Sequence, residues 1–482
     1  MITVNYHKTC PNGQDLKLVI NEQVVEVNEP ADRTALQYLR ANGLTGTKEG
    51  CASGDCGACT VMVGELKDGK VQFKAVNSCI VPVGQLSGMH VVTVEGLADQ
   101  SGLHPVQAEM VACHGSQCGF CTPGFVMSLA AMLENGDPAK IETVQQGISG
   151  NLCRCTGYRP IVQAGMNALG RDYESRLQDP VFFKATKPPS SGSVQQPLNE
   201  SALREAMLQY PQASLIAGGT DLMLEVTQRY QPFECLIDVS RVTELRSITE
   251  TQDTYTIGSS VTYTELEQFF ATRSEQLVSL LHRLGSRQIR NCGTIGGNLA
   301  NGSPIADMPP VLICWDATLE LCSSAGQRRE VDVNEFYTGY RQTVLRNDEY
   351  IAGIRIPKTS FNAFTRFYKS SKRIEDDISS VMGACLFEGD GVKITAARIA
   401  FGGMAATPLR LRGIEDMLVG KLVNHELLED VSAALGKAMA PLTDVRASAE
   451  YRAAMARSMV ERALNEFSGV SKPLVMALEL HA

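Results

Sequence analysis

The sequence predicts a multidomain α+β protein. Its 482 residues, of which 44% are hydrophobic and 20% charged, are enough for three or four domains, each with its own core. Alternating apolar and polar residues near the start of the chain indicate strands, and short helical patterns follow them. Glycine-rich stretches and then longer helical runs indicate further mixed domains in the second half.

The composition excludes some classes of partner. The net charge is −9, and no basic stripe occurs in the sequence. Nucleic acids and anionic membranes attract basic surfaces, so neither is expected as a partner. The start of the chain, MITVNYHKTCPNG, lacks the apolar core of a secretion signal, and no run of about 18 apolar residues follows. We therefore expect a cytoplasmic protein whose fifteen cysteines serve as metal ligands, reactive thiols or buried hydrophobes rather than disulfides.

The first group of cysteines lies in the stretch CASGDCGACT. Cys51, Cys56 and Cys59, with Cys79 as a distant fourth, have the C-x4-C-x2-C spacing that is typical of a plant-type 2Fe–2S cluster. The small residues between them leave room for backbone N–H groups to approach the negatively charged sulfurs of a cluster. A zinc ion held by four thiolates is the alternative, although zinc sites usually pair two C-x2-C units.

The surrounding pattern predicts a small sheet crossed by a helix. Strands are expected at 16–20, 24–27, 71–76 and 91–94, and a short helix at 34–40.

The second group of cysteines lies in SQCGFCTPGFVMSL and GNLCRCTGYRPI. It consists of Cys118, Cys121, Cys153 and Cys155. A proline closely follows each pair and is well placed at the start of a helix. With helical patterns also at 106–113 and 141–148, four short helices are expected around a second cluster, and zinc is again the alternative.

The remaining cysteines show no ligand spacing, and most of them are expected to be buried hydrophobes. They are Cys10, Cys113, Cys235, Cys292, Cys314, Cys322 and Cys385.

These two motifs, in this order, closely resemble the iron–sulfur part of the xanthine dehydrogenase and aldehyde oxidase family of molybdenum hydroxylases. The resemblance implies a plant-type ferredoxin-like β-grasp domain over residues 1–97 and a four-helix 2Fe–2S bundle domain over residues 98–172. It also implies that Gln117 and Cys155 face the molybdopterin of a neighbouring domain.

A break in the pattern follows these domains. Residues 173–196 carry prolines and serines with little periodicity and are interpreted as a linker across the surface. Beyond them, an apolar strand runs into Gly218, Gly219 and Thr220, whose backbone could supply consecutive donors to a diphosphate. Turn glycines would explain the same pattern.

The stretches SLIAGGTDLMLEV and NCGTIGGNLANGSPIADMPPVL resemble the flavin-binding segments of the same family. The resemblance implies an FAD domain of the vanillyl-alcohol-oxidase type over residues 197–360. Asp221 and Asp307 would contact ribityl or ribose hydroxyls, since a carboxylate beside a phosphate would be repelled. The implied FAD contacts are Leu215, Ile216, Ala217, Gly218, Gly219, Thr220, Asp221, Leu222, Leu284, Thr294, Gly297, Asn298, Leu299, Ser303, Pro304, Asp307, Ile351 and Lys369.

The charged segment FTRFYKSSKRIEDDISSV, residues 364–381, resembles the loop beside the flavin in this family. In that case Lys369 would approach the isoalloxazine ring, and a group of charged residues would set the electrostatic field where NAD meets the flavin. The alternative is a solvated surface run of charges. The residues of that group are Arg373, Glu375, Asp376 and Asp377.

The last part of the chain, with FGGMAATPLR and helical runs at 414–419, 425–438 and 449–466, resembles the small α+β domain that closes the flavoprotein part of the family. This domain is expected over residues 361–482. No molybdopterin domain follows it, so the resemblance implies an electron-transfer subunit. Its expected partner is a molybdopterin-binding large subunit, with two heterodimers paired.

The implied function is electron transfer in a xanthine dehydrogenase that oxidises xanthine or hypoxanthine with NAD as acceptor. Electrons would pass from molybdopterin through the cluster of the second cysteine group, then that of the first, to FAD and NAD. No residue of this chain is expected to act on the purine. Two alternatives remain: a related subunit for an aldehyde or N-heterocycle that uses oxygen or another acceptor, and a structural zinc and flavin protein without electron transfer.

Overall fold

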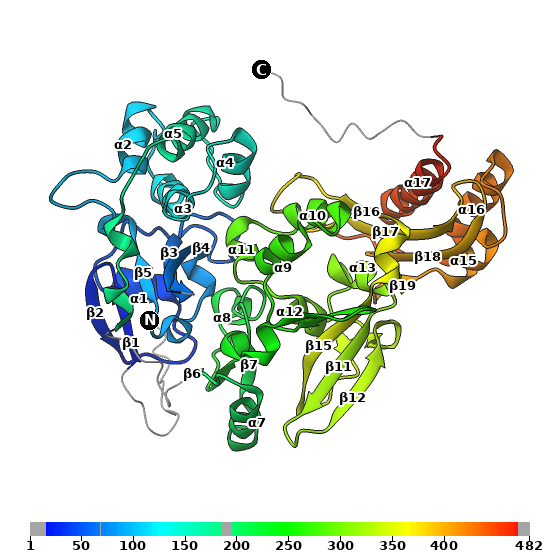
Figure 1. The fold of residues 1–482 in the computed structure, drawn as a ribbon, viewed down its shortest axis with the longest axis horizontal. Coiled ribbons are helices and arrows are strands. Elements are labelled where there is room, and N and C mark those ends of the chain that lie inside the picture. Colours follow the sequence, from blue (N-terminus) through cyan, green and yellow to red (C-terminus); the bar gives the residue numbers. More distant parts are fainter. Residues whose placement is uncertain (1–15, 68, 185–193, 471–482) are drawn as a thin grey trace.

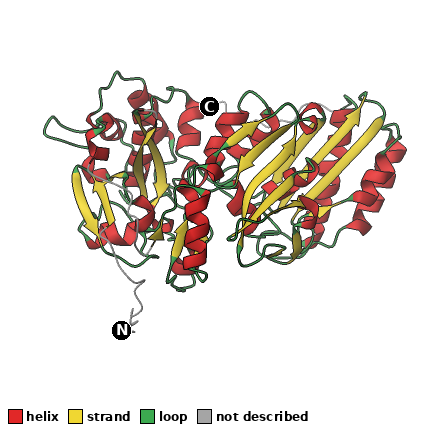
Figure 2. Cartoon of the chain, turned by 60° about the horizontal axis from the view of Figure 1, so that its bottom comes forward, coloured by secondary structure: helices red, strands yellow, loops and turns green. Residues whose placement is uncertain are grey.

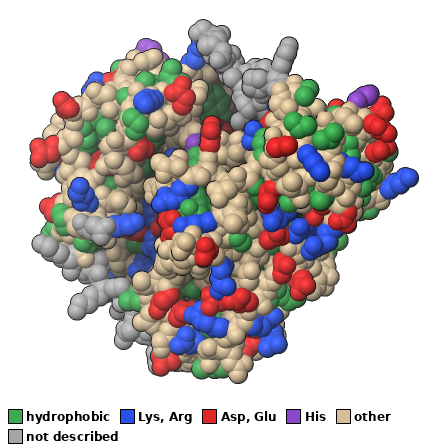
Figure 3. Space-filling model, turned by 45° about the vertical axis from the view of Figure 1, so that its right-hand side comes forward, with side chains coloured by type: hydrophobic (Ala, Val, Ile, Leu, Met, Phe, Trp, Pro, Cys, Tyr) green, Lys and Arg blue, Asp and Glu red, His purple; other side chains and the backbone are tan. Residues whose placement is uncertain are grey.

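The computed structural model describes residues 16–67, 69–184 and 194–470 (Figure 1). The N-terminal sheet and a group of helices form one side of the molecule, the C-terminal sheet forms the other side, and a mixed domain lies between them. On the face shown in Figure 3, basic and acidic side chains are interspersed rather than separated into large patches. Within the described ranges, no helix has the length and apolar character needed to cross a bilayer.

The first domain is a five-stranded sheet in the order β2-β1-β5-β3-β4, with one helix against it. β1 and β5 are parallel, and the other neighbours are antiparallel. The helix begins where predicted, because Thr34 and Gln37 form a reciprocal capping box. The predicted hairpin, helix and later strands are confirmed. The elements are β1 (Leu16–Ile20), β2 (Gln23–Val27), α1 (Ala35–Ala41), β3 (Thr60–Lys67), β4 (Lys70–Asn77) and β5 (His90–Val92), with short 3-10 turns η1 (Ser78–Ile80), η2 (Val83–Leu86) and η3 (Val94–Gly96).

The second domain is the predicted set of four short helices. Its central helix α3 packs directly on the first sheet: Phe125 and Leu129 of this helix share a buried core with Met62 of β3 and Phe73 of β4. This shared core joins the first two domains into one unit. The helices are α2 (Pro105–Ala112), α3 (Thr122–Glu134), α4 (Ile141–Gly147) and α5 (Arg159–Leu169).

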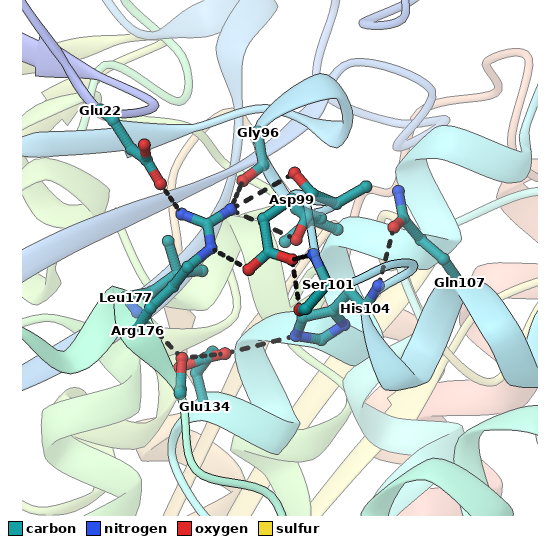
Figure 4. Close-up of polar contacts among 12 residues, drawn as sticks. Glu22, Gly96, Asp99, Ser101, His104, Gln107, Glu134, Arg176 and Leu177 are labelled. Carbon is teal, nitrogen blue, oxygen red and sulfur yellow. Dashed lines mark hydrogen bonds and ion pairs between the residues drawn. The ribbon is translucent and has the colours of Figure 1, made fainter.

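The predicted linker is more ordered than its composition indicated. The 3-10 turn η4 (Arg176–Gln178) inserts Leu177 into the core of the second domain, where the side chain is 1% exposed. Arg176 beside it donates to the backbone oxygen of Gly96 at 2.8 Å and to Asp99, and it also pairs with Glu22 (Figure 4). A helical turn, α6 (Val181–Lys184), follows, and residues 185–193 lie outside the described part.

The third domain combines two sheets. A small parallel sheet has the order β6-β8-β7, and an antiparallel sheet has the order β12-β11-β15-β10-β9. β6 pairs with β8, so the first strand of this domain precedes residue 197, the predicted start. The strands are β6 (Val194–Gln195), β7 (Ser214–Ile216), β8 (Leu236–Asp238), β9 (Ile248–Glu250), β10 (Thr254–Gly258), β11 (Thr318–Ser323), β12 (Arg328–Asp332), β13 (Tyr337–Gly339), β14 (Gln342–Thr343) and β15 (Glu349–Pro357).

The helices of the third domain pack in more than one buried core, and the core that contains Phe270, Leu281 and Leu312 also holds residues of β10, β11 and β15. The helices are α7 (Glu200–Gln209), α8 (Leu224–Thr227), α9 (Tyr263–Phe270), α10 (Glu275–His282), α11 (Arg287–Arg290), α12 (Ile295–Ala300), α13 (Met308–Cys314) and α14 (Thr359–Asn362), with 3-10 turns η5 (Val239–Arg241), η6 (Glu244–Arg246) and η7 (Val333–Glu335).

The fourth domain is an antiparallel sheet, β16-β17-β18-β19, with helices packed on it (Figure 2). The predicted helical runs are confirmed. The elements are β16 (Phe364–Ser370), β17 (Val381–Gly389), β18 (Ile394–Gly402), β19 (Leu409–Arg410), α15 (Arg412–Leu418), α16 (His425–Ala438) and α17 (Ala449–Phe467).

Cysteines without ligand spacing follow the prediction in part. Cys314, Cys322 and Cys385 are buried, whereas Cys113, Cys235 and Cys292 are half-buried. Cys10 lies outside the described residues.

Candidate functional site: two thiol clusters beside glycine-rich loops

The first cysteine group converges in the structure. The loop between α1 and β3 brings Cys51, Cys56 and Cys59 toward Cys79, which lies in η1. Cys51 lies within hydrogen-bond reach of Cys56 and Cys79, and Cys59 within reach of Cys79. These hydrogen bonds lower the pKa of the Cys51 thiol and raise the pKa of Cys56 and Cys79. Cys59 and Cys79 are buried, so the group faces the protein interior.

The loop around this group has no room for side chains at its glycines. A Cβ at Gly50 would lie 2.7 Å from Cys56 Sγ. Gly57 has a φ of +66°, and its Cβ would lie 2.3 Å from the backbone oxygen of Gly150. Backbone N–H groups of Cys51 and Ser53 donate to the sulfurs of Cys56 and Cys51, each at 3.4 Å. This is the environment that an inorganic cluster with negatively charged sulfurs requires.

The second cysteine group lies at the surface. Cys118 and Cys155 are exposed and within hydrogen-bond reach of each other, while Cys121 and Cys153 are half-buried and face each other. Each of these two pairs therefore contains one cysteine from each of the two sequence motifs. Burial raises the pKa of the Cys121 thiol to about 12. Thr156 donates to Cys153 Sγ from its backbone at 3.4 Å and from its hydroxyl at 3.1 Å.

This surface also holds the residue predicted to face molybdopterin. Gln117 is exposed directly beside Cys118. An open groove of about 420 Å³ lies next to it. Its lining residues are Val94, Gln107, Met110, Val111, His114, Ser116, Gly119, Thr122, Pro123 and Val126.

Among the described residues, no three His, Cys, Asp or Glu side chains are arranged to hold a single metal ion. A 2Fe–2S cluster has two irons that share the four thiolates, so it spans a wider group than zinc does.

The predicted diphosphate loop lies between the first cysteine group and the rest of the third domain. A Cβ at Gly218 would lie 1.9 Å from the backbone oxygen of Cys292, so the two glycine-rich stretches touch by backbone. Gly219 has a φ of +69°, and its Cβ would lie 2.8 Å from the oxygen of Ile80, the residue after Cys79. Farther along, Gln228 donates to the carbonyl oxygens of Cys51 and Ala52, at 3.3 and 2.9 Å.

The second glycine-rich stretch begins α12. Thr294 caps this helix by accepting from the backbone N–H of Gly297 at 3.1 Å. The side-chain oxygen of Asn298 is buried without a hydrogen-bond partner, as expected of a group that awaits a ligand. Leu299 is fully buried in the core of the domain. Asp221, by contrast, is exposed and lies 3.9 Å from Arg341.

Several predicted flavin contacts meet at a buried ion pair. Lys369 Nζ lies 2.8 Å from Asp307 Oδ2 and also donates to the carbonyl oxygen of Arg283, directly before Leu284. Ser379 donates to the other carboxylate oxygen of Asp307 at 2.5 Å. Lys369 is therefore not part of a solvated run, and both carboxylate oxygens of Asp307 already have partners.

The remaining predicted contacts line different parts of this region. Leu284 and Ile351 are buried in one core, and the carbonyl oxygen of Pro304 accepts from Gly403 at 2.9 Å. Leu215 and Ile216 end β7, and Ala217 lies between this strand and the glycines. Thr220, Leu222 and Ser303 are half-buried nearby in sequence.

The structure also places a buried carboxylate that the sequence did not single out as a site of its own. Asp376 has a φ of +49°, is 8% exposed, and has one carboxylate oxygen without a partner. Burial, and then repulsion from Asp55, raise its pKa to about 7. Because Asp55 precedes Cys56, the loop after β16, which contains Asp376, lies beside the first cysteine loop.

A cavity of about 100 Å³ between the first and third domains was also not predicted. Ala217, Gly218 and Thr294 of the expected FAD set lie on its wall. Charged groups from both domains line this cavity. Because these groups lie far apart in the sequence, no sequence pattern predicted the cavity. These groups are Glu65, Lys74, Arg241 and Arg246.

Comparison with known families agrees with this division of the chain. Residues 18–84 match the model of a 2Fe-2S iron-sulfur cluster binding domain, and residues 93–166 match a [2Fe-2S] binding domain. Residues 190–359 match the FAD binding domain in molybdopterin dehydrogenase, and residues 366–467 match the CO dehydrogenase flavoprotein C-terminal domain.

Similar whole proteins include two groups. Xanthine dehydrogenase of Drosophila subobscura is 33% identical over 86% of this chain and 36% of its own length, and that of rice is 33% identical over 83% and 35%. The chain thus spans about a third of the length of these relatives. A carbon monoxide dehydrogenase chain from Hydrogenophaga pseudoflava has a TM-score of 0.54 and 30% identity, over 58% of this chain and 98% of its own. A chain of quinoline 2-oxidoreductase from Pseudomonas putida 86 has a TM-score of 0.53 and 26% identity, over 57% and 97%.

The domains and sites together define an iron–sulfur flavoprotein with two 2Fe–2S domains and one FAD domain. The chain belongs to the molybdenum hydroxylase family, as the cysteine motifs predicted.

Proposed function

We propose that this chain is the electron-transfer part of a molybdenum hydroxylase of the xanthine dehydrogenase type. In this proposal, a cytoplasmic partner that carries molybdopterin oxidises xanthine or hypoxanthine, and NAD is the final acceptor. The observation that supports it most is the order of the sites. An exposed cysteine group contacts a buried one, and the buried group lies against the loops of the FAD domain.

The residues at each proposed site fit the cofactor that the proposal assigns to them. Cys51, Cys56, Cys59 and Cys79 would hold one cluster, and Cys118, Cys121, Cys153 and Cys155 the other. When bound, the clusters supply one-electron transfer and the flavin exchanges electron pairs. Cys59 and Cys79 of the first site are buried, and Cys118 and Cys155 of the second site are exposed to a partner.

The FAD domain contributes binding and charge. The backbone at Gly218 and Gly219 would donate to the diphosphate, and the unpartnered oxygen of Asn298 would accept from the cofactor. Lys369 would present its ammonium group from the buried pair with Asp307 to the flavin. Asp376 can hold a proton at its free carboxylate oxygen close to the first cluster loop.

The partner would bind at the exposed cysteine surface. Gln117 and Cys155 are exposed, and Ser116 and Gly119, close to Gln117 in the sequence, line the open groove. A molybdopterin-binding large subunit on this face, in a dimer of heterodimers, would complete the route.

The substrate and acceptor are tested with the complex purified through a tag on this chain. We expect xanthine to drive NADH formation, followed by absorbance. The curated relatives named xanthine dehydrogenase support this choice. If xanthine fails but an N-heterocycle or aldehyde reduces the flavin, the alternative substrate class is correct. The quinoline 2-oxidoreductase chain of similar structure favours that second candidate.

A further inference from the structure

The two cysteine groups are joined by backbone, and three glycines make this contact close. The backbone N–H of Leu152, directly before Cys153, donates to the carbonyl oxygen of Cys56 at 3.0 Å. A Cβ at Gly124 would lie 2.2 Å from the oxygen of Gly57, and one at Gly57 would lie 2.3 Å from the oxygen of Gly150. Larger residues at these points would push the two loops apart.

A buried polar group lies directly beside this contact. Asn151 donates to the oxygen of Gly57 at 3.0 Å and to the hydroxyl of Thr60 at 3.2 Å. Its own side-chain oxygen accepts from Ser128 at 2.6 Å. Asn151 thus links the first domain to α3 and to the segment that leads into Cys153.

The third domain completes this network with one side chain. Gln288, on α11, donates to Asn151 Oδ1 at 3.0 Å, to Ser128 at 3.1 Å and to Thr60 at 3.3 Å. Gln288 and its three partners are each at most 2% exposed. In Figure 1, α11 lies between the N-terminal side of the molecule and the rest of the third domain. A buried polar group is costly unless it is hydrogen-bonded, so the bonds donated by Gln288 Nε2 favour one arrangement of the three domains. The Oε1 atom of Gln288 is buried without a partner and adds nothing to this preference.

We propose that Gln288 is a positioning residue for electron transfer between the two clusters. By holding Asn151, it keeps the Leu152–Cys56 hydrogen bond closed and makes the distance between the cluster-binding loops depend on docking of the flavin domain. Cys153 and Cys56 would each help to hold one of the two clusters, which would supply transfer of a single electron with no change of any bond. This inference rests on the proposed cluster ligands.

The test compares two buried glutamines that join the same domains. Gln288→Met removes the donor with little change in shape. Gln85→Met is the matched control, because Gln85 also crosses between the first and third domains, to the oxygen of Ala217 at 2.8 Å and to Asp238 at 3.0 Å, away from the cluster contact. Hydrogen exchange is measured on the purified full chain, and the magnetic interaction between the two reduced clusters is measured by electron paramagnetic resonance.

We expect Gln288→Met to keep iron and FAD, to raise the exchange rate of the amides at 150–153 about tenfold, and to weaken the inter-cluster magnetic interaction. Gln85→Met should change neither. The proposal is overturned if Gln288→Met matches the wild type, or if both variants change these two readouts equally, which would indicate a general structural role. If Gln288→Met does not assemble clusters, Ser128→Ala is the second variant, because it removes one contact of the network. It should produce the same changes to a smaller degree. Unchanged exchange rates and an unchanged magnetic interaction in Ser128→Ala also overturn the proposal.

The wild-type protein provides an independent check. Its Leu152 amide should exchange as slowly as the amides of α3, although the side chain is 39% exposed. Fast exchange at Leu152 contradicts the closed contact. Absence of iron and sulfide from the wild-type chain would instead contradict the proposed function, so the two failures are distinguishable.

Discussion

Lys369 and Asp307 form an ion pair with side chains that are only 2% and 9% exposed, and it joins the fourth domain to the third. Removal of one partner leaves an uncompensated charge in a buried place, which typically costs about 3–5 kcal/mol. We expect Lys369→Met to lower the thermal unfolding midpoint and to weaken FAD retention, measured by flavin absorbance after gel filtration. The double variant Lys369→Met, Asp307→Leu should recover part of the stability but not the FAD. A single variant as stable as the wild type would contradict the role of this pair.

The close backbone contact at Gly57 gives a second prediction. Gly57→Ala adds a Cβ to a left-handed residue and also places it 2.3 Å from the oxygen of Gly150. Gly69 is the matched control, because its φ is +77° but nothing lies within 4 Å of the added atom. Gly69→Ala should cost about 1–2 kcal/mol through its backbone alone. Gly57→Ala should be clearly more destabilising and should reduce the iron content. Equal effects of Gly57→Ala and Gly69→Ala on stability and iron content would show that the close contact at Gly57 contributes to neither.

The separation of the cluster and flavin sites gives a third prediction. Cys153→Ser should remove one cluster and stop electron flow from substrate to NAD, while FAD stays bound. Electron transfer from NADH to an artificial dye should remain largely intact, because it needs only the flavin. Iron analysis, flavin absorbance and the two activities measure these outcomes. Loss of FAD from this variant would contradict the assignment of the sites to separate domains.

Asp376 predicts a pH dependence of stability. Burial raises its pKa from 3.8 to about 7 in the folded chain, so the folded state binds more protons than the unfolded state between these values. Stability should therefore fall as pH rises from about 4 to about 7, by an amount on the order of 4 kcal/mol for this group. Asp376→Asn should be more stable than the wild type at pH 8, and the difference should disappear near pH 4. Unfolding midpoints over this pH range test this, and a constant difference would contradict the shifted pKa.

Local patterns predicted much of the fold because they depend on neighbouring residues. The capping box at Thr34 and the alternation of the first hairpin need only a few residues each. The spacing of Cys51, Cys56 and Cys59 likewise identified a cluster loop from adjacent residues.

Contacts between distant segments were beyond such patterns. Gln288 meets Asn151 across 137 positions of sequence, and nothing in either local stretch indicates the other. Arg176 and Leu177 lie in a segment that reads as a linker, yet their partners in the first two domains order it. The repulsion between Asp55 and Asp376 arises only because two charged loops from different domains are packed together.

The central claim is that electrons move between two clusters and a flavin within this one chain. An anaerobic titration of the purified chain with NADH, followed by absorbance and paramagnetic resonance, tests it most directly. We predict uptake of about four electrons per chain, one for each cluster and two for the flavin, with bleaching of the flavin and of both clusters. Uptake of only about two electrons, with bleaching confined to the flavin and zinc in place of iron, would contradict the account.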